Sequence, residues 1–292
     1  MIAPVGGAAL PQLLIEGDGP RTVLMLHGWP DTHRVWDSTV AALRHQARCV
    51  RFTLPGFDPG QAHGPRHAVP LAEVVQCIAR VADEVSPKAP VTLMLHDWGC
   101  FFGYQYAHQH KTRVERVIGV DIGDAGSRHH RREMSWRAMA LTLGYQLWLA
   151  AAWRIGGERG NRMARWIAKL FHAPAAAPDI TASQGYPYAI QWFGVAGGFG
   201  QLRAFAPQVP MLFVHGQRKP MMFHSSNWAE RIGARPGCRV LGFPTGHWVM
   251  NQAPAEFNAE VLQWLQDTEH LCRGSERNLP HPAQPLNARA LP

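Results

Sequence analysis

The sequence predicts an α/β protein whose central sheet is mainly parallel and covered by helices on both faces. Apolar runs of strand length recur along the chain, and segments with helical periodicity lie between them. Parallel strands buried on both faces are apolar throughout, and their alternation with helices is typical of this class. A length of 292 residues with 46% apolar residues suits one large domain with an insertion.

Seven segments are expected to be strands. Residues 10–17 open the series and end in the turn signal Gly-Asp-Gly-Pro. Residues 22–26 form a continuous apolar run, as a buried parallel strand should. The expected strands, in order, are 10–17, 22–26, 49–54, 91–95, 114–121, 209–216 and 238–243.

Helices are expected between these strands. The clearest is 71–85, where apolar residues recur at helical spacing on one side. The others are expected at 36–45, 99–110 and 255–271. After residue 127 the alternation stops, and helical pieces are expected at 136–153 and 163–171.

This interruption predicts the domain organisation. Residues 1–127 and 207–273 are expected to form the α/β core, and residues 128–206 a helical cap inserted into it. The segment 274–292 is rich in Pro and Arg and is expected to be disordered.

Composition excludes several classes of function. The formal net charge is +8, but the basic residues are mostly single arginines, which favours a solvated surface over a nucleic-acid partner. The five cysteines lack paired spacing, so neither a metal site nor a disulfide framework is indicated. The start lacks the features of a signal peptide, and no apolar run reaches membrane-spanning length. We therefore expect a cytoplasmic protein without cofactor or membrane partner, and a homodimer stays open.

Asp97 is the candidate nucleophile. It follows the apolar run 91–95 and His96, and a helical segment begins directly after it, with a small residue at Gly99. This pattern is typical of a strand that breaks sharply into a helix and exposes one side chain at the turn. A carboxylate there can attack a saturated carbon, and the resulting ester can be hydrolysed, whereas a serine would form a stable ether. Asp97 thus indicates epoxide opening or halide displacement. The alternative is a loop aspartate that caps the helix.

Three stretches together resemble the α/β-hydrolase superfamily, in particular its epoxide hydrolase and haloalkane dehalogenase branch. They are His-Gly-Trp-Pro-Asp at 27–31, His-Asp-Trp-Gly at 96–99 and Gly-His-Trp at 246–248. The resemblance implies an α/β-hydrolase fold, with Asp97 as nucleophile and His247 as the base that activates water.

The same resemblance implies supporting roles near the nucleophile. The backbone N–H groups of Trp29 and Trp98 would form an oxyanion hole. Gly28 would allow a close backbone approach, the bond before Pro30 would be cis, and His27 would brace the loop.

The acid that orients His247 is less obvious from the sequence. Many relatives carry it in a Gly-x-x-Asp segment after the strand that corresponds to 209–216, where this chain has Lys219. Some dehalogenases of the branch place the acid after the preceding strand. That alignment favours Asp124, with Asp121 as the alternative.

The leaving group separates the two chemistries. Epoxide hydrolases use cap tyrosines to donate a proton, and the segment 144–148 resembles theirs, which implies Tyr145 as one donor. The second is expected to be Tyr188, with Tyr186 as the alternative, and Tyr186 and Trp148 are expected to contact substrate. Trp29 stands where many dehalogenases have a halide-binding Asn.

We therefore expect an epoxide hydrolase that acts on a small apolar epoxide without a cofactor. The first alternative is a haloalkane dehalogenase with the same nucleophile. The second is a hydrolase-fold protein that has lost catalysis and binds a ligand or partner, for which Lys219 is the main support.

Overall fold

The structure is a computed structural model that describes residues 9–60, 66–200, 202 and 205–271. The predicted tail at 274–292 lies outside the described residues, as do the first eight residues of the core.

The described residues contain one seven-stranded sheet in the order β1-β3-β2-β4-β5-β6-β7. β1 pairs antiparallel with β3 at one edge, and all other neighbours are parallel. The predicted class, a mostly parallel sheet flanked by helices, is confirmed. The strands are β1 (Leu14–Glu16), β2 (Thr22–Leu26), β3 (Arg48–Arg51), β4 (Val91–His96), β5 (Val114–Val120), β6 (Met211–Gly216) and β7 (Arg239–Phe243).

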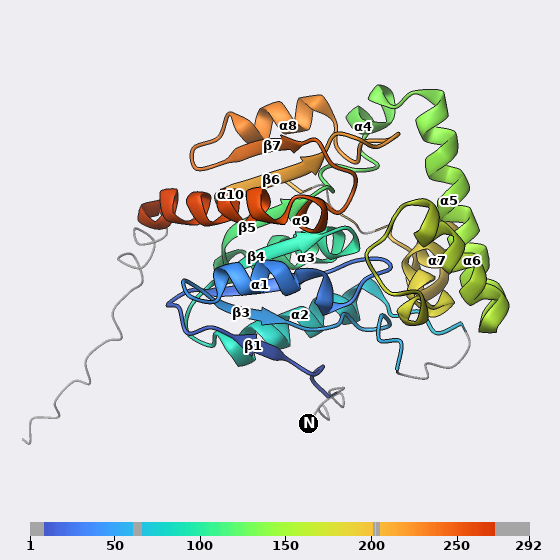
Figure 1. The fold of residues 1–292 in the computed structure, drawn as a ribbon, viewed down its shortest axis with the longest axis horizontal. Coiled ribbons are helices and arrows are strands. Elements are labelled where there is room, and N and C mark those ends of the chain that lie inside the picture. The colour runs from blue at the N-terminus through green and yellow to red at the C-terminus, as the bar shows by residue number, and fades with distance from the viewer. Residues whose placement is uncertain (1–8, 61–65, 201, 203–204, 272–292) are drawn as a thin grey trace, which may run out of the picture.

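Helices cover both faces of the sheet (Figure 1). The core helices are α1 (Asp37–Leu43), α2 (Leu71–Val85), α3 (Trp98–Gln109), α8 (Ser226–Gly233), α9 (Val249–Gln252) and α10 (Pro254–Asp267). Short 3-10 helices are η1 (His33–Trp36) and η2 (Lys111–Arg113).

The central strands are mostly apolar because both of their faces are buried. In β4, Leu93 and Leu95 join the core that α2 and α3 cover, whereas Met94 joins the core beneath α1 and α10. The same alternation occurs in β6. Successive strand residues point to opposite faces, so a mostly apolar run is what a sheet between two helical layers requires.

The parallel register brings the carboxyl ends of the strands to one edge. Leu26 pairs with Leu95, His96 with Val120, and Val120 with Val214, so β2, β4, β5 and β6 end at the same level. The loops that follow these strands therefore converge there, which is where open α/β sheets bind ligands.

A helical cap lies between β5 and β6 and covers this edge (Figure 1). Its helices are α4 (Arg128–Glu133), α5 (Trp136–Ile155), α6 (Gly157–Leu170) and α7 (Tyr186–Phe193), with 3-10 turns η3 (Ala177–Asp179), η4 (Ala182–Gly185) and η5 (Val195–Gly197). α5 begins at its expected start, residue 136. α6 begins six residues before the predicted segment 163–171. Within the described ranges, no helix is long and apolar enough to cross a membrane.

Candidate active site

Asp97 lies at the sharp turn between β4 and α3. Its backbone has φ 51° and ψ −122°, which non-glycine residues seldom adopt. Such strain is typical of a nucleophile held on a strand–helix elbow. A Cβ at Gly99 would come within 2.5 Å of the carbonyl oxygens of Leu26 and His27, so only glycine lets the helix start this close to β2.

The carboxylate of Asp97 is held by backbone N–H groups. Its Oδ1 accepts a hydrogen bond of 2.7 Å from the N–H of Trp29, and the N–H of Trp98 also lowers its pKa. A Cβ at Gly28 would lie 2.3 Å from Oδ1, which explains the glycine there. The predicted pair of N–H donors therefore faces the predicted nucleophile. The peptide bond between Trp29 and Pro30 is cis, as the resemblance implies.

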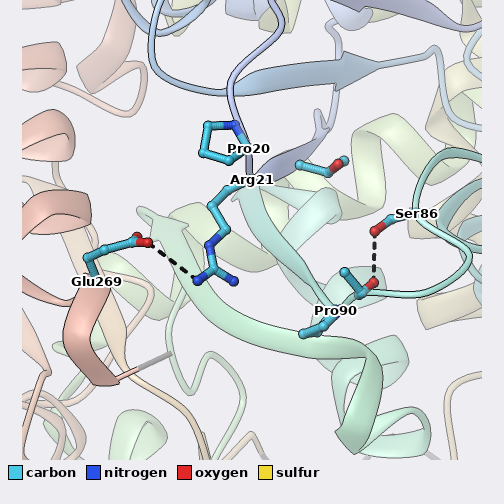
Figure 2. Close-up of a pocket in the computed structure, with 7 residues that line it drawn as sticks. Pro20, Arg21, Ser86, Pro90 and Glu269 are labelled. Carbon is cyan, nitrogen blue, oxygen red and sulfur yellow. Dashed lines mark hydrogen bonds and ion pairs between the residues drawn. The ribbon is translucent and has the colours of Figure 1, made fainter. Parts of the chain in front are cut away.

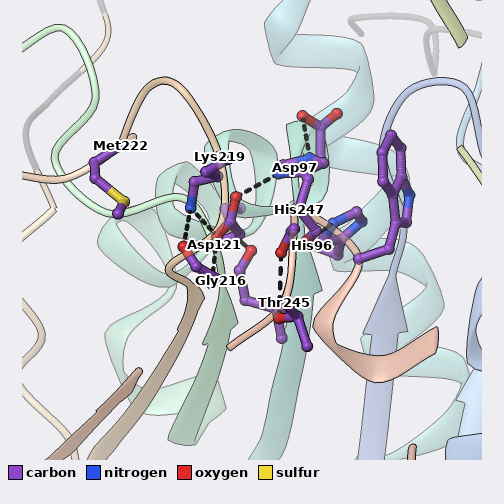
Figure 3. Close-up of polar contacts among 12 residues, drawn as sticks. His96, Asp97, Asp121, Gly216, Lys219, Met222, Thr245 and His247 are labelled. Carbon is purple, nitrogen blue, oxygen red and sulfur yellow. Dashed lines mark hydrogen bonds and ion pairs between the residues drawn. The ribbon is translucent and has the colours of Figure 1, made fainter. Parts of the chain in front are cut away.

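His247 lies between two carboxylates, those of Asp97 and Asp121 (Figure 3). Its Nε2 is 3.3 Å from Asp97 Oδ2, and its Nδ1 is hydrogen-bonded to Asp121 Oδ2. Burial lowers the pKa of His247, but the charges and hydrogen bonds of the two carboxylates outweigh burial and raise it to about 9. Burial would raise the pKa of Asp97, and the contacts with His247 hold it below its usual value.

The expectation that Asp124 orients His247 is wrong, and Asp121, the alternative, occupies that position. Asp124 turns toward α8, where its carboxylate accepts hydrogen bonds from the N–H (2.7 Å) and hydroxyl (2.8 Å) of Ser225 and from the Ser127 hydroxyl (2.6 Å). Asp121 is fully buried, with φ 71°, immediately after β5. It therefore reaches His247 directly, while Asp124 anchors the start of α8.

Lys219 contacts the same acid. Its Nζ donates to Asp121 Oδ1 and to the carbonyl of Gly216 (2.9 Å), and the N–H of Gly216 also donates to Oδ1 (2.9 Å). Burial would raise the pKa of Asp121, but the charges of His247 and Lys219 hold it below its usual value. The lysine at the position expected for an acid thus stabilises the ionised form of an acid from the neighbouring strand (Figure 3).

Asp97 and His247 line a cavity of about 370 Å³ beneath the cap. Tyr145 from α5 and Tyr188 from α7 line it too, with their rings perpendicular and 6.1 Å apart. Burial raises the pKa of both hydroxyls, which keeps them protonated and able to donate. The rest of the wall is largely apolar and aromatic, and its members include Trp29, Leu170, Phe171, Met221, Phe223 and Trp248.

The expected substrate contacts of Tyr186 and Trp148 are wrong. Tyr186 is fully buried, donates to the carbonyl of Pro55 (3.1 Å) and packs against Phe57. Trp148 lies on the outside of the cap and donates to the carbonyl of Met163 (3.1 Å). Neither residue lines the cavity that contains Asp97.

Three buried groups behind His247 were not assigned a role from the sequence. Asp31 accepts a 2.7 Å hydrogen bond from the indole of Trp248, and its Oδ2 is 3.9 Å from Nδ1 of His96. Burial raises the pKa of Asp31 to about 7 and lowers that of His96 to about 3. All three lie within the motifs at 27–31, 96–99 and 246–248, so these motifs could have indicated that the three residues belong to the site. His27, as expected, braces the loop by accepting from the N–H of Leu54 (2.9 Å).

A second cavity, of about 430 Å³, lies at the opposite edge of the sheet, near the start of β2 (Figure 2). Its charged groups neutralise each other, since Arg21 pairs with Glu115 (2.9 Å) and Glu269 (3.3 Å). Asp31, His96 and His247, whose pKa values are strongly shifted, lie at the other edge, around Asp97. Among the described residues there is no cluster of His, Cys, Asp or Glu that could hold a metal ion.

Comparison with known families matches residues 21–153 to the model of the alpha/beta hydrolase fold. The chain has the α/β-hydrolase fold. A solved Bacillus megaterium epoxide hydrolase in complex with an inhibitor superimposes with a TM-score of 0.68 at 18% identity, covering 88% of this chain and 96% of that one.

Two curated relatives add to the resemblance. A Mycobacterium tuberculosis protein named "Probable oxidoreductase EphD" is 36% identical over 89 residues, which are 30% of this chain and only 15% of the relative. The epoxide hydrolase of Caballeronia sordidicola is 22% identical over 87% of this chain and 90% of its own length. The chain is thus an α/β hydrolase by fold and is similar to epoxide hydrolases.

Proposed function

We propose that this protein is an epoxide hydrolase that acts through an ester on Asp97. The observation that carries the proposal is the set of groups facing one cavity. A carboxylate on an elbow lies 3.3 Å from a histidine, and two protonated tyrosines line the same wall. Each group has a task in opening an epoxide and none needs a cofactor.

In the first step, an Asp97 oxygen attacks one ring carbon and the carbon–oxygen bond of the ring breaks. The ring oxygen takes a proton from Tyr145 or Tyr188, leaving a hydroxyalkyl ester on Asp97 and a tyrosinate. The low pKa of Asp97 favours the ionised nucleophile, and the protonated tyrosines favour departure of the oxygen.

In the second step, His247 takes a proton from water, and the hydroxide adds to the ester carbon. The oxyanion is stabilised by the N–H groups of Trp29 and Trp98. The intermediate collapses and releases the alkoxide of the diol, which takes the proton from His247. Asp97 is left as the protonated acid, and its proton passes to the tyrosinate. Asp121 holds His247 in place through Nδ1. The sum is addition of one water to the epoxide.

A haloalkane dehalogenase is the second candidate, and one observation favours it. A departing halide needs N–H donors, and the buried indole N–H of Trp29 has no hydrogen-bond partner among the described residues. Trp29 also lines the cavity. The tyrosines favour the epoxide, since a halide needs no proton donor. The non-catalytic alternative was supported mainly by Lys219 at the position expected for the acid. The contact of Asp121 with His247 weakens that support.

Trapping the ester tests the proposal. Purified protein would be offered styrene-type, aliphatic and bulky epoxides beside bromoalkanes, and diol and bromide would be measured. His247→Gln should stop the second step, and intact-protein mass should rise by the whole mass of the epoxide. A bromoalkane would add only its alkyl group, which separates the two candidates.

Asp97→Asn is the matched control and should show no mass increase. Normal turnover by His247→Gln would show that the two-step scheme is wrong. If neither class of compound reacts with the wild type, the catalytic proposal fails.

A further inference from the structure

The outer face of α6 combines basic and apolar side chains. Arg159, Arg162, Trp166, Lys169 and Leu170 recur at helical spacing and share one face, since all fall within about 100° around the helix axis. Trp166 and Leu170 are 54% and 56% exposed. The helix buries its other face through Ala164, Ile167 and Ala168.

α5 extends this surface beside α6 (Figure 1). Leu141, Trp148 and Ile155 stand seven residues apart, on one side of α5, and are all exposed. The rings of Trp148 and Trp166 lie 5.3 Å apart and join the two helices. We call the outer cap face the surface formed by Leu141, Trp148, Ile155, Arg159, Arg162, Trp166, Lys169 and Leu170.

Exposed apolar side chains are concentrated in the cap. Of the fourteen large apolar residues that are exposed in the described chain, all but Leu10, Ile15 and Leu271 lie between residues 136 and 193. Nine of these eleven lie on α5 and α6. Exposed apolar patches are uncommon on monomeric soluble proteins and mark interaction sites.

The positive charge is concentrated in the same segment of the chain. Residues 128–200 contain nine basic and three acidic residues, a net of +6 out of +8 for the whole chain. Arg159, Arg162 and Lys169 form no ion pair with other described residues. A second copy docked cap to cap would bring two surfaces of like charge together, which opposes a symmetric dimer through this face.

We propose that the outer cap face binds the surface of an anionic lipid bilayer. Tryptophan and leucine side chains enter the boundary between headgroups and acyl chains, and arginine and lysine pair with anionic headgroups. The attachment is interfacial, since the apolar side chains lie on the outer surface of two helices. A membrane surface as partner differs from the sequence-based expectation of no membrane partner.

The face also reaches the catalytic cavity. Leu170, at the end of α6, belongs to the outer cap face and also lines the cavity that contains Asp97. If the proposed epoxide hydrolase activity holds, an apolar epoxide dissolved in the bilayer can pass Leu170 into the site without crossing water. The membrane binding itself does not depend on that activity.

Vesicle sedimentation of the full chain tests the proposal. The protein should sediment with vesicles of phosphatidylcholine mixed with phosphatidylglycerol and stay in solution with phosphatidylcholine alone. Raising the ionic strength from about 0.1 to about 1 M shortens the screening length from about 10 to about 3 Å and should release most of the protein. Equal binding to both vesicles, or to neither, would overturn the proposal.

Variants then locate the surface. Arg159→Gln/Arg162→Gln/Lys169→Gln should weaken partitioning about 100-fold, since each basic residue near an anionic surface contributes about fivefold. Ile155→Ser/Trp166→Ser should weaken it by removing the inserted apolar groups. The matched control removes the same charge from exposed core positions, as Arg44→Gln/Lys88→Gln/Arg231→Gln.

The control triple variant should bind almost as the wild type does, and a loss equal to that of the cap triple would refute the outer cap face as the site. Asp97→Asn should bind unchanged, so loss of catalysis and loss of binding are distinguishable. Sedimentation equilibrium without lipid tests whether a second copy of the chain binds the outer cap face instead. A dimer that the cap triple variant abolishes would replace the membrane with a second copy.

Discussion

Removing the charge of Lys219 should slow the second step of the proposed reaction. Lys219 donates to the carboxylate of Asp121, which in turn holds His247. Once Asp97 is esterified, its negative charge is gone, and His247 keeps its contact with Asp121, which is paired with Lys219. His96, packed against His247, stays neutral because burial lowers its pKa to about 3. The positive charge of Lys219 then offsets the negative charge of Asp121, which lowers the pKa of His247 and helps it to lose its proton.

The size of the effect follows from Coulomb's law. Unit charges that flank a shared carboxylate interact by roughly 2–4 kcal/mol at an effective dielectric constant of about 20. The side chain of Lys219 is only 7% exposed, so solvent screens this interaction weakly. One pKa unit corresponds to about 1.4 kcal/mol. Lys219→Met should therefore raise the pKa of His247 in the ester state by about 1.5 to 3 units.

A higher pKa leaves less neutral His247 at a given pH, so the acid limb of kcat should move to higher pH. Steady-state kcat against pH measures the shift, and intact-protein mass at neutral pH should show ester accumulating in Lys219→Met. Lys219→Arg keeps the charge and should keep the wild-type limb. The Gly216 N–H still holds Asp121 in both variants. An unshifted limb, or one moved to lower pH, would refute the reasoning.

Three further outcomes follow from the contacts. Asp124→Ala removes the acceptor of two hydrogen bonds from Ser225 and should lower the free energy of unfolding by about 1–3 kcal/mol in urea without moving the kcat–pH profile. Burial raises the pKa of Asp31 to about 7, so the folded state binds its proton more tightly and the contribution of Asp31 to stability falls as pH rises from about 4 to 7. Asp31→Asn should lack that decline, and parallel urea titrations across this range check it. In Gly28→Ala the new Cβ would meet the Asp97 carboxylate, so single-turnover ester formation should fall about 100-fold.

The core elements could be predicted where the burial pattern is local. α2 has the predicted bounds 71–85, because its buried residues recur with a helical period over four turns. β4 was evident because both of its faces are buried. α8 was not predicted, since its eight residues bury only Trp228 and Ile232, one turn apart, which is too little periodicity to detect.

The cap tyrosines show a different limit. The sequence placed both Tyr186 and Tyr188 late in the cap, and residues two apart on a helix point in nearly opposite directions. One must therefore face the cavity and the other the core, but the sequence does not say which side of α7 meets the sheet. In the structure Tyr188 faces Trp98 and the cavity, as preferred, and Tyr186 packs on the core.

The acid of the site could not be settled from spacing alone, because Asp121 and Asp124 follow the same strand. What separates them is the direction of the chain after β5, which φ 71° at Asp121 sets. β5 and β6 are parallel neighbours with Val120 beside Val214, so a carboxylate after either strand can reach His247. The site needs an acid beside Nδ1 and does not depend on which strand supplies it. Lys219 therefore stands at the position expected for the acid, while Asp121 supplies the carboxylate from β5. The charge of Lys219 beside Asp121 distinguishes His247 from a histidine that is held by a carboxylate alone.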